Sequence, residues 1–165
     1  MHIAIAIPVY NEAGVVEQTH AHICAVVDEL PYQFTFYYVD DGSNDGTEKS
    51  LNTLVIKDRR VKVITLSRNF GHQAALSAGL DRAEGDVVIS MDGDGQHPPE
   101  MIPQMLNLIK QGYDIVQAQR MDEAQPAFLG QGDGKARLGH GVHGRRHDGN
   151  VEGDARGETG HDVHL

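Results

Sequence analysis

GDVVISMDGDGQHPP, residues 85–99, is the stretch of sequence that decides the fold. Its first part, residues 87–91, is a short apolar run that predicts a buried strand. The run ends in two carboxylates, Asp92 and Asp94, which an extended backbone would place on the same side of the chain. The glycines beside them let a ligand approach the main chain closely. Two such carboxylates suit a divalent cation held by oxygen atoms, and Gln96 could add a neutral oxygen from the next same-side position.

The same stretch has a second interpretation as an acidic turn, because Asp and Gly are ordinary turn residues. A calcium loop of the helix–loop–helix type is excluded. No third acidic ligand follows Gly95, and Pro103 occupies the position of the bidentate glutamate in such a loop. The choice between a turn and a metal site therefore depends on what the rest of the chain places beside these carboxylates.

Strand-like and helix-like segments alternate along the chain up to residue 118. Runs rich in β-branched and aromatic residues predict strands, and apolar residues at helical spacing predict helices. The expected strands are 2–9, 34–39, 61–66, 87–91 and 113–118, and the expected helices are 13–30, 48–56, 74–83 and 101–110. This alternation with short connections predicts an α/β fold, with a mostly parallel sheet and helices on both of its faces.

Acidic side chains follow three of the expected strands where these strands end. Glu12 follows the first strand, Asp41 the second, and Asp92 with Asp94 the fourth. Ligands of open α/β sheets bind beyond the carboxyl ends of the strands. We therefore expect Glu12, Asp41 and Asp92 to share one rim of the sheet, which favours a ligand site over a set of unrelated acidic turns.

Composition excludes several classes of protein. The 165-residue chain has a formal net charge of −10, whereas proteins that grip nucleic-acid backbones are usually basic. A single cysteine, Cys24, excludes an intramolecular disulfide framework and reads as a small core residue. No signal peptide is visible, and no apolar stretch approaches the roughly 20 residues needed to span a bilayer.

The composition changes near Leu129. Residues 130–165 hold ten of the 19 glycines and five of the ten histidines, with no aromatic residue. Such a segment buries too little apolar surface to offset the entropy of ordering it, which predicts disorder. Three of its histidines, His140, His143 and His147, could bind zinc, but the Gly-rich setting favours accidental spacing. We expect a folded part over residues 1–129, followed by a dispensable Gly/His-rich tail.

Four motifs occur in order along the folded part: PVYNE at 8–12, VDDGSNDGT at 39–47, RNFG at 68–71 and MDGDGQHPPE at 91–100. The set resembles the family 2 glycosyltransferases of the GT-A fold, which is Rossmann-like. Within that family it looks most like the polyprenyl-phosphate glycosyltransferases, over about residues 2–128. Each motif alone is weak, but four of them in this order form a specific signal.

The resemblance implies roles for individual residues. Asp92 and Asp94 match the metal-binding, catalytic carboxylate pair, and Gln96 matches a third ligand of Mg²⁺ or Mn²⁺. Positions that match nucleotide contacts are Pro8, Tyr10, Glu12, Asp40, Asp41, Arg68 and Asp92. The implied donor is a UDP- or GDP-sugar, whose departing diphosphate the cation would stabilise.

Simpler structural explanations exist for several of these residues. Glu12 could be a helix N-terminal carboxylate favoured by the helix dipole. Residues 40–43 could form only a strand-to-helix turn, with Asp45 or Thr47 capping the helix that follows. Arg68 could pair with any acid on the surface.

The implied reaction is a metal-dependent, inverting transfer of the sugar to a polyprenyl phosphate, in the cytoplasm and at the membrane face. Members of the family continue into an acceptor-binding half, which this sequence lacks after Leu129. We interpret the chain as truncated, with an out-of-frame tail; an apolar, amphipathic reading in another frame of the coding DNA would support this hypothesis. The alternative function is a non-catalytic, nucleotide-diphosphate-binding remnant.

Overall fold

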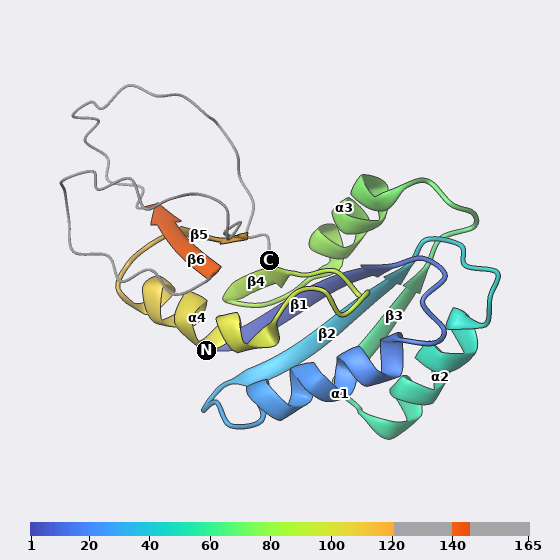
Figure 1. Ribbon diagram of the computed structural model, residues 1–165, viewed down its shortest axis with the longest axis horizontal. Helices are drawn as coiled ribbons and strands as arrows, with labels where there is room; N and C mark the ends of the chain where they lie inside the picture. Colours follow the sequence, from blue (N-terminus) through green and yellow to red (C-terminus); the bar gives the residue numbers. More distant parts are fainter. Residues whose placement is uncertain (121–139, 146–165) are drawn as a thin grey trace.

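The computed structural model describes residues 1–120 and 140–145. Strands and helices alternate from the N-terminus, as the sequence predicts (Figure 1). In chain order the elements are β1 (His2–Val9), α1 (Val16–Val27), β2 (Gln33–Asp40), α2 (Thr47–Lys57), β3 (Val61–Thr65), α3 (His72–Arg82), β4 (Val87–Ser90), the 3₁₀ helix η1 (Pro99–Met101), α4 (Ile102–Lys110), β5 (Ile115–Arg120) and β6 (His140–Arg145).

The main sheet has four strands in the order β3-β2-β1-β4, and all of its pairs are parallel. The chain builds outward from β1 through β2 to β3 and then returns to place β4 on the other side of β1. The strand order therefore reverses between β1 and β4. In open α/β sheets, the crevice at the carboxyl ends of two such strands is the usual ligand position.

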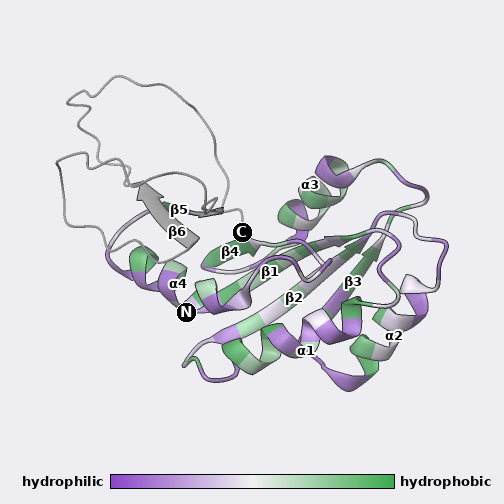
Figure 2. Cartoon of the chain, viewed as in Figure 1, coloured by the Kyte–Doolittle hydropathy of each residue, from purple (hydrophilic) through white to green (hydrophobic). Residues whose placement is uncertain are grey.

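One face of the sheet carries the larger part of the core. Side chains alternate along a strand, so every second residue of β1, from Ile3 to Val9, points to the face that α1, α2 and α4 cover. From the helices, Val16 and Ile23 of α1, Leu51 of α2 and Ile102 of α4 pack against it, and all of them are buried. Figure 2 shows β1 and β4 largely in the green of apolar residues.

Helix α3 covers the opposite face of the sheet (Figure 1). Its Gly79 lies against β1 and β2: a Cβ atom there would be 3.0 Å from Val39 and 3.3 Å from Ala6. Because Gly79 has no side chain, α3 can pack close to the strands at this point. Helices thus lie on both faces of a parallel sheet, and the predicted α/β architecture is confirmed.

The fifth strand differs from the expectation. β5 pairs antiparallel with β6 in a separate two-stranded sheet, in a register that runs from Ile115 opposite Arg145 to Arg120 opposite His140. Residues 140–145 thus form a strand where composition predicts none. Strand pairing satisfies backbone groups and does not need the large apolar side chains on which that prediction depended. Residues 130–139 and 146–165 of the predicted tail lie outside the described residues.

Within the described ranges, no helix has the length and apolar character needed to cross a membrane.

The two-stranded sheet leads to a test of the predicted dispensable tail. A chain that ends at Leu129 lacks β6 but keeps the whole four-stranded sheet. We expect its nucleotide affinity to equal that of the full chain, because none of the described residues after position 129 lines the β1–β4 crevice. Calorimetric titration of both chains measures this directly. A clear loss of affinity in the shorter chain would mean that residues 130–165 support the site.

Candidate functional site

A pocket of about 250 Å³ opens at the carboxyl ends of β1 and β4. Four segments line it: the end of β1 and the loop after it, the end of β2, the start of α3, and the loop after β4. The lining residues are Pro8, Val9, Tyr10, Glu12, Asp41, Asn69, Gly71, His72, Ala75, Asp92, Gly93 and Asp94. The predicted rim is therefore present, because Glu12, Asp41 and Asp92 all line one pocket.

The loop after β1 is fastened to the loop after β2. Asn11, in the left-handed region at φ +57°, accepts a hydrogen bond from the Asn44 backbone N–H and donates its own backbone N–H to Ser43 Oγ. The backbone N–H of Glu12 donates to Thr47 Oγ1 at 2.8 Å, and the Thr47 hydroxyl donates to Asp45 at 2.6 Å. These bonds hold Glu12 at the pocket edge before α1 begins.

Asp41 joins β2 to the start of α3. Its two carboxylate oxygens accept backbone N–H donors from Phe70, at 2.8 Å, and from Gly71, at 2.9 Å. The residue is only 2% exposed. Asp41 thus satisfies amide groups at the N-terminus of α3, where they lack partners within the helix. Neither the four motifs nor their spacing indicates this role, because the donors lie about thirty residues further along the chain.

Gly93 brings the loop after β4 against β1. Its backbone N–H donates to Pro8 O at 3.3 Å, and a Cβ atom at this position would lie 2.3 Å from Val9 Cγ1. The glycine between the two aspartates is therefore required by packing. It places Asp92 and Asp94 beside the end of β1, in the same pocket.

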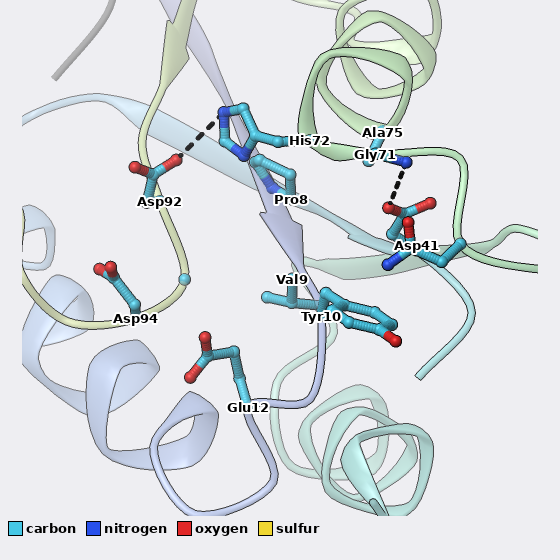
Figure 3. A pocket seen from close by; sticks show the side chains of 12 residues that line it. Pro8, Val9, Tyr10, Glu12, Asp41, Gly71, His72, Ala75, Asp92 and Asp94 are labelled. Carbon is cyan, nitrogen blue, oxygen red and sulfur yellow. Dashed lines mark hydrogen bonds and ion pairs between the residues drawn. The ribbon is translucent and has the colours of Figure 1, made fainter. Parts of the chain in front are cut away.

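Three carboxylates gather at this side of the pocket, as Figure 3 shows for Glu12, Asp92 and Asp94. Desolvation raises the pKa of Glu12, and the negative charges of Asp94 and Asp45 raise it further. Like charges in one pocket repel one another, and a divalent cation would relieve that repulsion. Hard cations such as Mg²⁺ prefer carboxylate oxygens as ligands, so the donor set fits such an ion.

Two histidines that sequence analysis did not select lie beside Asp92. His72 Nε2 is 3.5 Å from Asp92 Oδ1 (Figure 3). His97 Nδ1 accepts the backbone N–H of Asp92 at 3.0 Å and is also 3.6 Å from the carboxylate. Because a nitrogen that accepts an amide hydrogen bond carries no proton, the shorter contact defines the interaction, and His97 orients the Asp92 backbone. His72 directly follows the motif at 68–71 and His97 lies within the motif at 91–100, and these positions were the available signal.

Three predicted site residues do not line the pocket. Asp40, which is 1% exposed, accepts the backbone N–H of Ser43 and so stabilises the turn after β2. The exposed Arg68 stacks on Phe70, with its guanidinium carbon 4.1 Å from the ring centroid. Gln96 is exposed, and its backbone N–H donates to Asp94 Oδ1 at 2.8 Å. The chain turns at residues 93–94 instead of staying extended, which removes Gln96 from the expected same-side position.

The raised pKa of Glu12 leads to a prediction. A carboxyl group whose pKa rises on folding lowers the free energy of unfolding as the pH increases and the group ionises. Ionised Glu12 therefore opposes folding at neutral pH. In metal-free buffer at pH 7, Glu12→Gln should raise the melting temperature, and the difference should vanish as the pH falls below the ordinary range of the carboxyl. Glu29→Gln, at an exposed glutamate after α1, serves as the control. A lower melting temperature for Glu12→Gln at pH 7 would contradict the repulsion.

Both the sequence and the fold of this chain are similar to those of known proteins. The model of glycosyl transferase family 2 matches residues 4–151, most of the chain. The chain belongs to this family. The matched residues extend beyond Leu129.

Curated relatives and a solved structure agree with the family. The chain is 41% identical to the uncharacterized glycosyltransferase YkcC of Bacillus subtilis, over 76% of this chain and 39% of that protein. It is 35% identical to the undecaprenyl-phosphate 4-deoxy-4-formamido-L-arabinose transferase of Aeromonas hydrophila, again over 76% and 39%. The mannosyltransferase PcManGT from Pyrobaculum calidifontis, solved with GDP-Man and Mn²⁺, shares the fold with a TM-score of 0.60 at 20% identity, covering 71% of this chain and 34% of that one.

This family 2 chain spans about two fifths of the length of the curated relatives that it matches. The residues that the family model matches contain the β1–β4 pocket and all four motifs.

Proposed function

We propose that this chain carries the donor site of a metal-dependent, inverting glycosyltransferase that moves a sugar from a UDP- or GDP-sugar to a polyprenyl phosphate. The observation that carries the proposal is the group of three carboxylates, Glu12, Asp92 and Asp94, in one pocket at the point where the strand order reverses. Family membership and a relative named as an undecaprenyl-phosphate transferase support the reaction class.

The donor set favours Mg²⁺ or Mn²⁺ at the acidic side of the pocket. Asp92 and Asp94 would hold the ion, with Gln96 as a third ligand if its side chain turns inward. The cation would supply positive charge to the departing diphosphate. Asp92 reaches this position because His97 fixes its backbone, and Asp94 because its carboxylate accepts the backbone N–H of Gln96.

The nucleoside would occupy the other side of the pocket. Each carboxylate oxygen of Asp41 has a second lone pair beside the one that binds a backbone amide, and a base N–H can donate to it. Tyr10, which lines the pocket and is 42% exposed, offers an aromatic face for the base, next to Pro8. Asp40 would contribute indirectly through the turn that positions Asp41. Arg68, stacked on Phe70 outside the pocket, would reach the donor only after leaving that stack.

The acceptor explains why the pocket needs no strong general base. A polyprenyl phosphate is already an anion and can attack the anomeric carbon directly, opposite the departing diphosphate, which inverts the configuration. Because this acceptor is a lipid, the reaction would take place at the cytoplasmic face of a membrane. Acceptor binding would need surfaces outside the donor pocket.

A labelled-donor assay tests the proposal. Labelled UDP- or GDP-sugar is incubated with the full chain and Mn²⁺, with and without a polyprenyl phosphate, and both lipid-linked and free sugar are measured. The proposal expects lipid-linked product only when the acceptor is present. Nucleotide binding without product would instead support the second candidate, a non-catalytic protein that binds nucleotide diphosphate. Absence of nucleotide binding would contradict both.

A further inference from the structure

A second group of ligating side chains lies beneath the sheet, between α1 and the turn after α2. It consists of His20 and Cys24, one helical turn apart on α1, and Asp58, and we name it the His20–Cys24–Asp58 cluster. His20 is 6% exposed and the Asp58 side chain 17%. None of the three lines the β1–β4 pocket, so the cluster is independent of the proposed function.

Two of the three ligand-atom separations match a tetrahedral metal site, and the third, between Cys24 Sγ and Asp58 Oδ2, is slightly longer. Cys24 Sγ is 3.4 Å from His20 Nε2, His20 Nε2 is 3.3 Å from Asp58 Oδ2, and Cys24 Sγ is 3.8 Å from Asp58 Oδ2. A tetrahedral zinc ion bonded at about 2.3 Å to sulfur and about 2.0 Å to nitrogen and oxygen separates its ligand atoms by about 3.3–3.6 Å. We propose that the cluster is a zinc site, with a water molecule in the fourth position.

Tyr38 provides the outer partner that a zinc-bound histidine needs. His20 Nδ1 is 3.1 Å from the Tyr38 hydroxyl, which is buried and can either donate or accept. With zinc on Nε2, the Nδ1–H group donates to the Tyr38 oxygen and fixes the ring. Without metal, Nε2–H donates to Asp58 and Nδ1 accepts from Tyr38. The same contact therefore suits both states.

The charges around the cluster also suit a dication. Arg60 donates to Asp58 at 2.8 Å, to Asp28 at 2.6 Å and to Cys24 Sγ at 3.4 Å. Without metal, two carboxylates and one guanidinium leave a net charge of −1. Zinc binding adds two positive charges, and the Cys24 S–H bond breaks as the S–Zn bond forms, releasing one proton to water. The loaded cluster is then neutral. Arg60 keeps its hydrogen bonds to Asp58 Oδ1, at 3.0 Å, and to Asp28 Oδ1, and gives up the one to Oδ2, which binds the zinc.

The alternative is a metal-free hydrogen-bond network. Arg60 already satisfies Asp58, and it lowers the pKa of that carboxyl to about 2, chiefly by hydrogen bonding. Burial raises the pKa of Cys24 to about 11, so the residue is a thiol at neutral pH until a metal replaces its proton. The two states differ in one observable, a sulfur–metal bond.

Cobalt reports that bond without ambiguity. Cys24 is the only cysteine in the chain, so sulfur-to-cobalt charge transfer can come from no other residue, whatever the acidic pocket or the remaining histidines bind. Metal-stripped full chain is titrated with Co²⁺ and then with Zn²⁺. We expect the charge-transfer band to saturate at a single equivalent and to disappear when zinc displaces cobalt. Zinc should also slow alkylation of Cys24 by about tenfold or more, because the metal occupies the reactive sulfur.

Variants distinguish residues that bind the metal from residues that do not. Cys24→Ser should abolish the band, and His20→Gln should weaken cobalt binding beyond the roughly 10- to 100-fold expected for Tyr38→Phe, which removes only an outer partner. His22→Gln is the matched control, because His22 lies on the same helix but is exposed and pairs with Glu100. An absent charge-transfer band in the full chain, or unchanged alkylation of Cys24 with zinc present, would overturn the proposal without use of any variant.

Discussion

The Asp94→Asn variant should lose the metal-dependent affinity of this chain for a nucleoside diphosphate, by about 100-fold or more. Asp94 and Glu12 share one pocket, and each carries a charge that repels an incoming diphosphate unless a cation lies between them. Neutralising one ligand removes a favourable charge–charge term of a few kcal/mol at partly buried sites, and about 2.7 kcal/mol corresponds to 100-fold. Titration of UDP and GDP in the presence of Mn²⁺ measures the change.

The control for this prediction is Asp81→Asn. Asp81 is exposed on α3 and does not line the pocket, so the same chemical change there should leave affinity unaltered. The Asp94→Asn chain should also keep the cobalt–sulfur band of the His20–Cys24–Asp58 cluster, which shows that its fold is intact. Equal nucleotide affinity in Asp94→Asn and the unaltered chain would remove Asp94 from the site.

A second large effect is expected at Gly42, where Gly42→Ala should destabilise the fold by about 3 kcal/mol. A Cβ atom at this position would lie 2.5 Å from the backbone carbon of Arg68, so the loop before α3 would have to move. The glycine also has φ +70°, a conformation that adds about 1–2 kcal/mol for other residues. Urea unfolding followed by circular dichroism measures the loss.

Two other glycines separate the steric contribution to this destabilisation from the backbone contribution. Gly112 has φ +89° but open space around its Cβ position, so Gly112→Ala should show only the backbone term of about 1–2 kcal/mol. Gly14 has open space and no positive φ, and Gly14→Ala should be close to neutral. If Gly42→Ala were no more destabilising than Gly112→Ala, the close contact between the β2 turn and the α3 loop would be incorrect.

The main sheet and the acidic side of the pocket could be predicted because each depends on local patterns. The apolar run at 87–91 and its two aspartates indicated β4 and the carboxylates after it, and strand–helix alternation indicated the parallel sheet. The sequence predicts a parallel α/β sheet but not the order of its strands. The sequence does not state that β4 pairs with β1, which is the pairing that creates the crevice.

The remaining features depend on contacts between distant segments. Asp41 binds amides about thirty residues away, and His72 reaches Asp92 from α3, so neither contact leaves a local pattern. Gln96 lies outside the pocket lining because the chain turns at residues 93–94, whereas side-chain alternation assumes an extended strand. The His20–Cys24–Asp58 cluster was missed because it also joins distant segments. Asp58 follows α2 while His20 and Cys24 lie on α1, and Cys24 alone resembles an ordinary core residue.

The central claim is that the β1–β4 pocket binds a nucleoside diphosphate through a divalent cation. Calorimetric titration of the full chain with UDP and with GDP tests it most directly, first with Mn²⁺, then after EDTA, then with Mn²⁺ restored. The account predicts that at least one of the two nucleotides binds with Mn²⁺, that EDTA abolishes binding and that restored Mn²⁺ recovers it. Binding of equal strength with and without EDTA, or no binding of either nucleotide under any of these conditions, would contradict the claim.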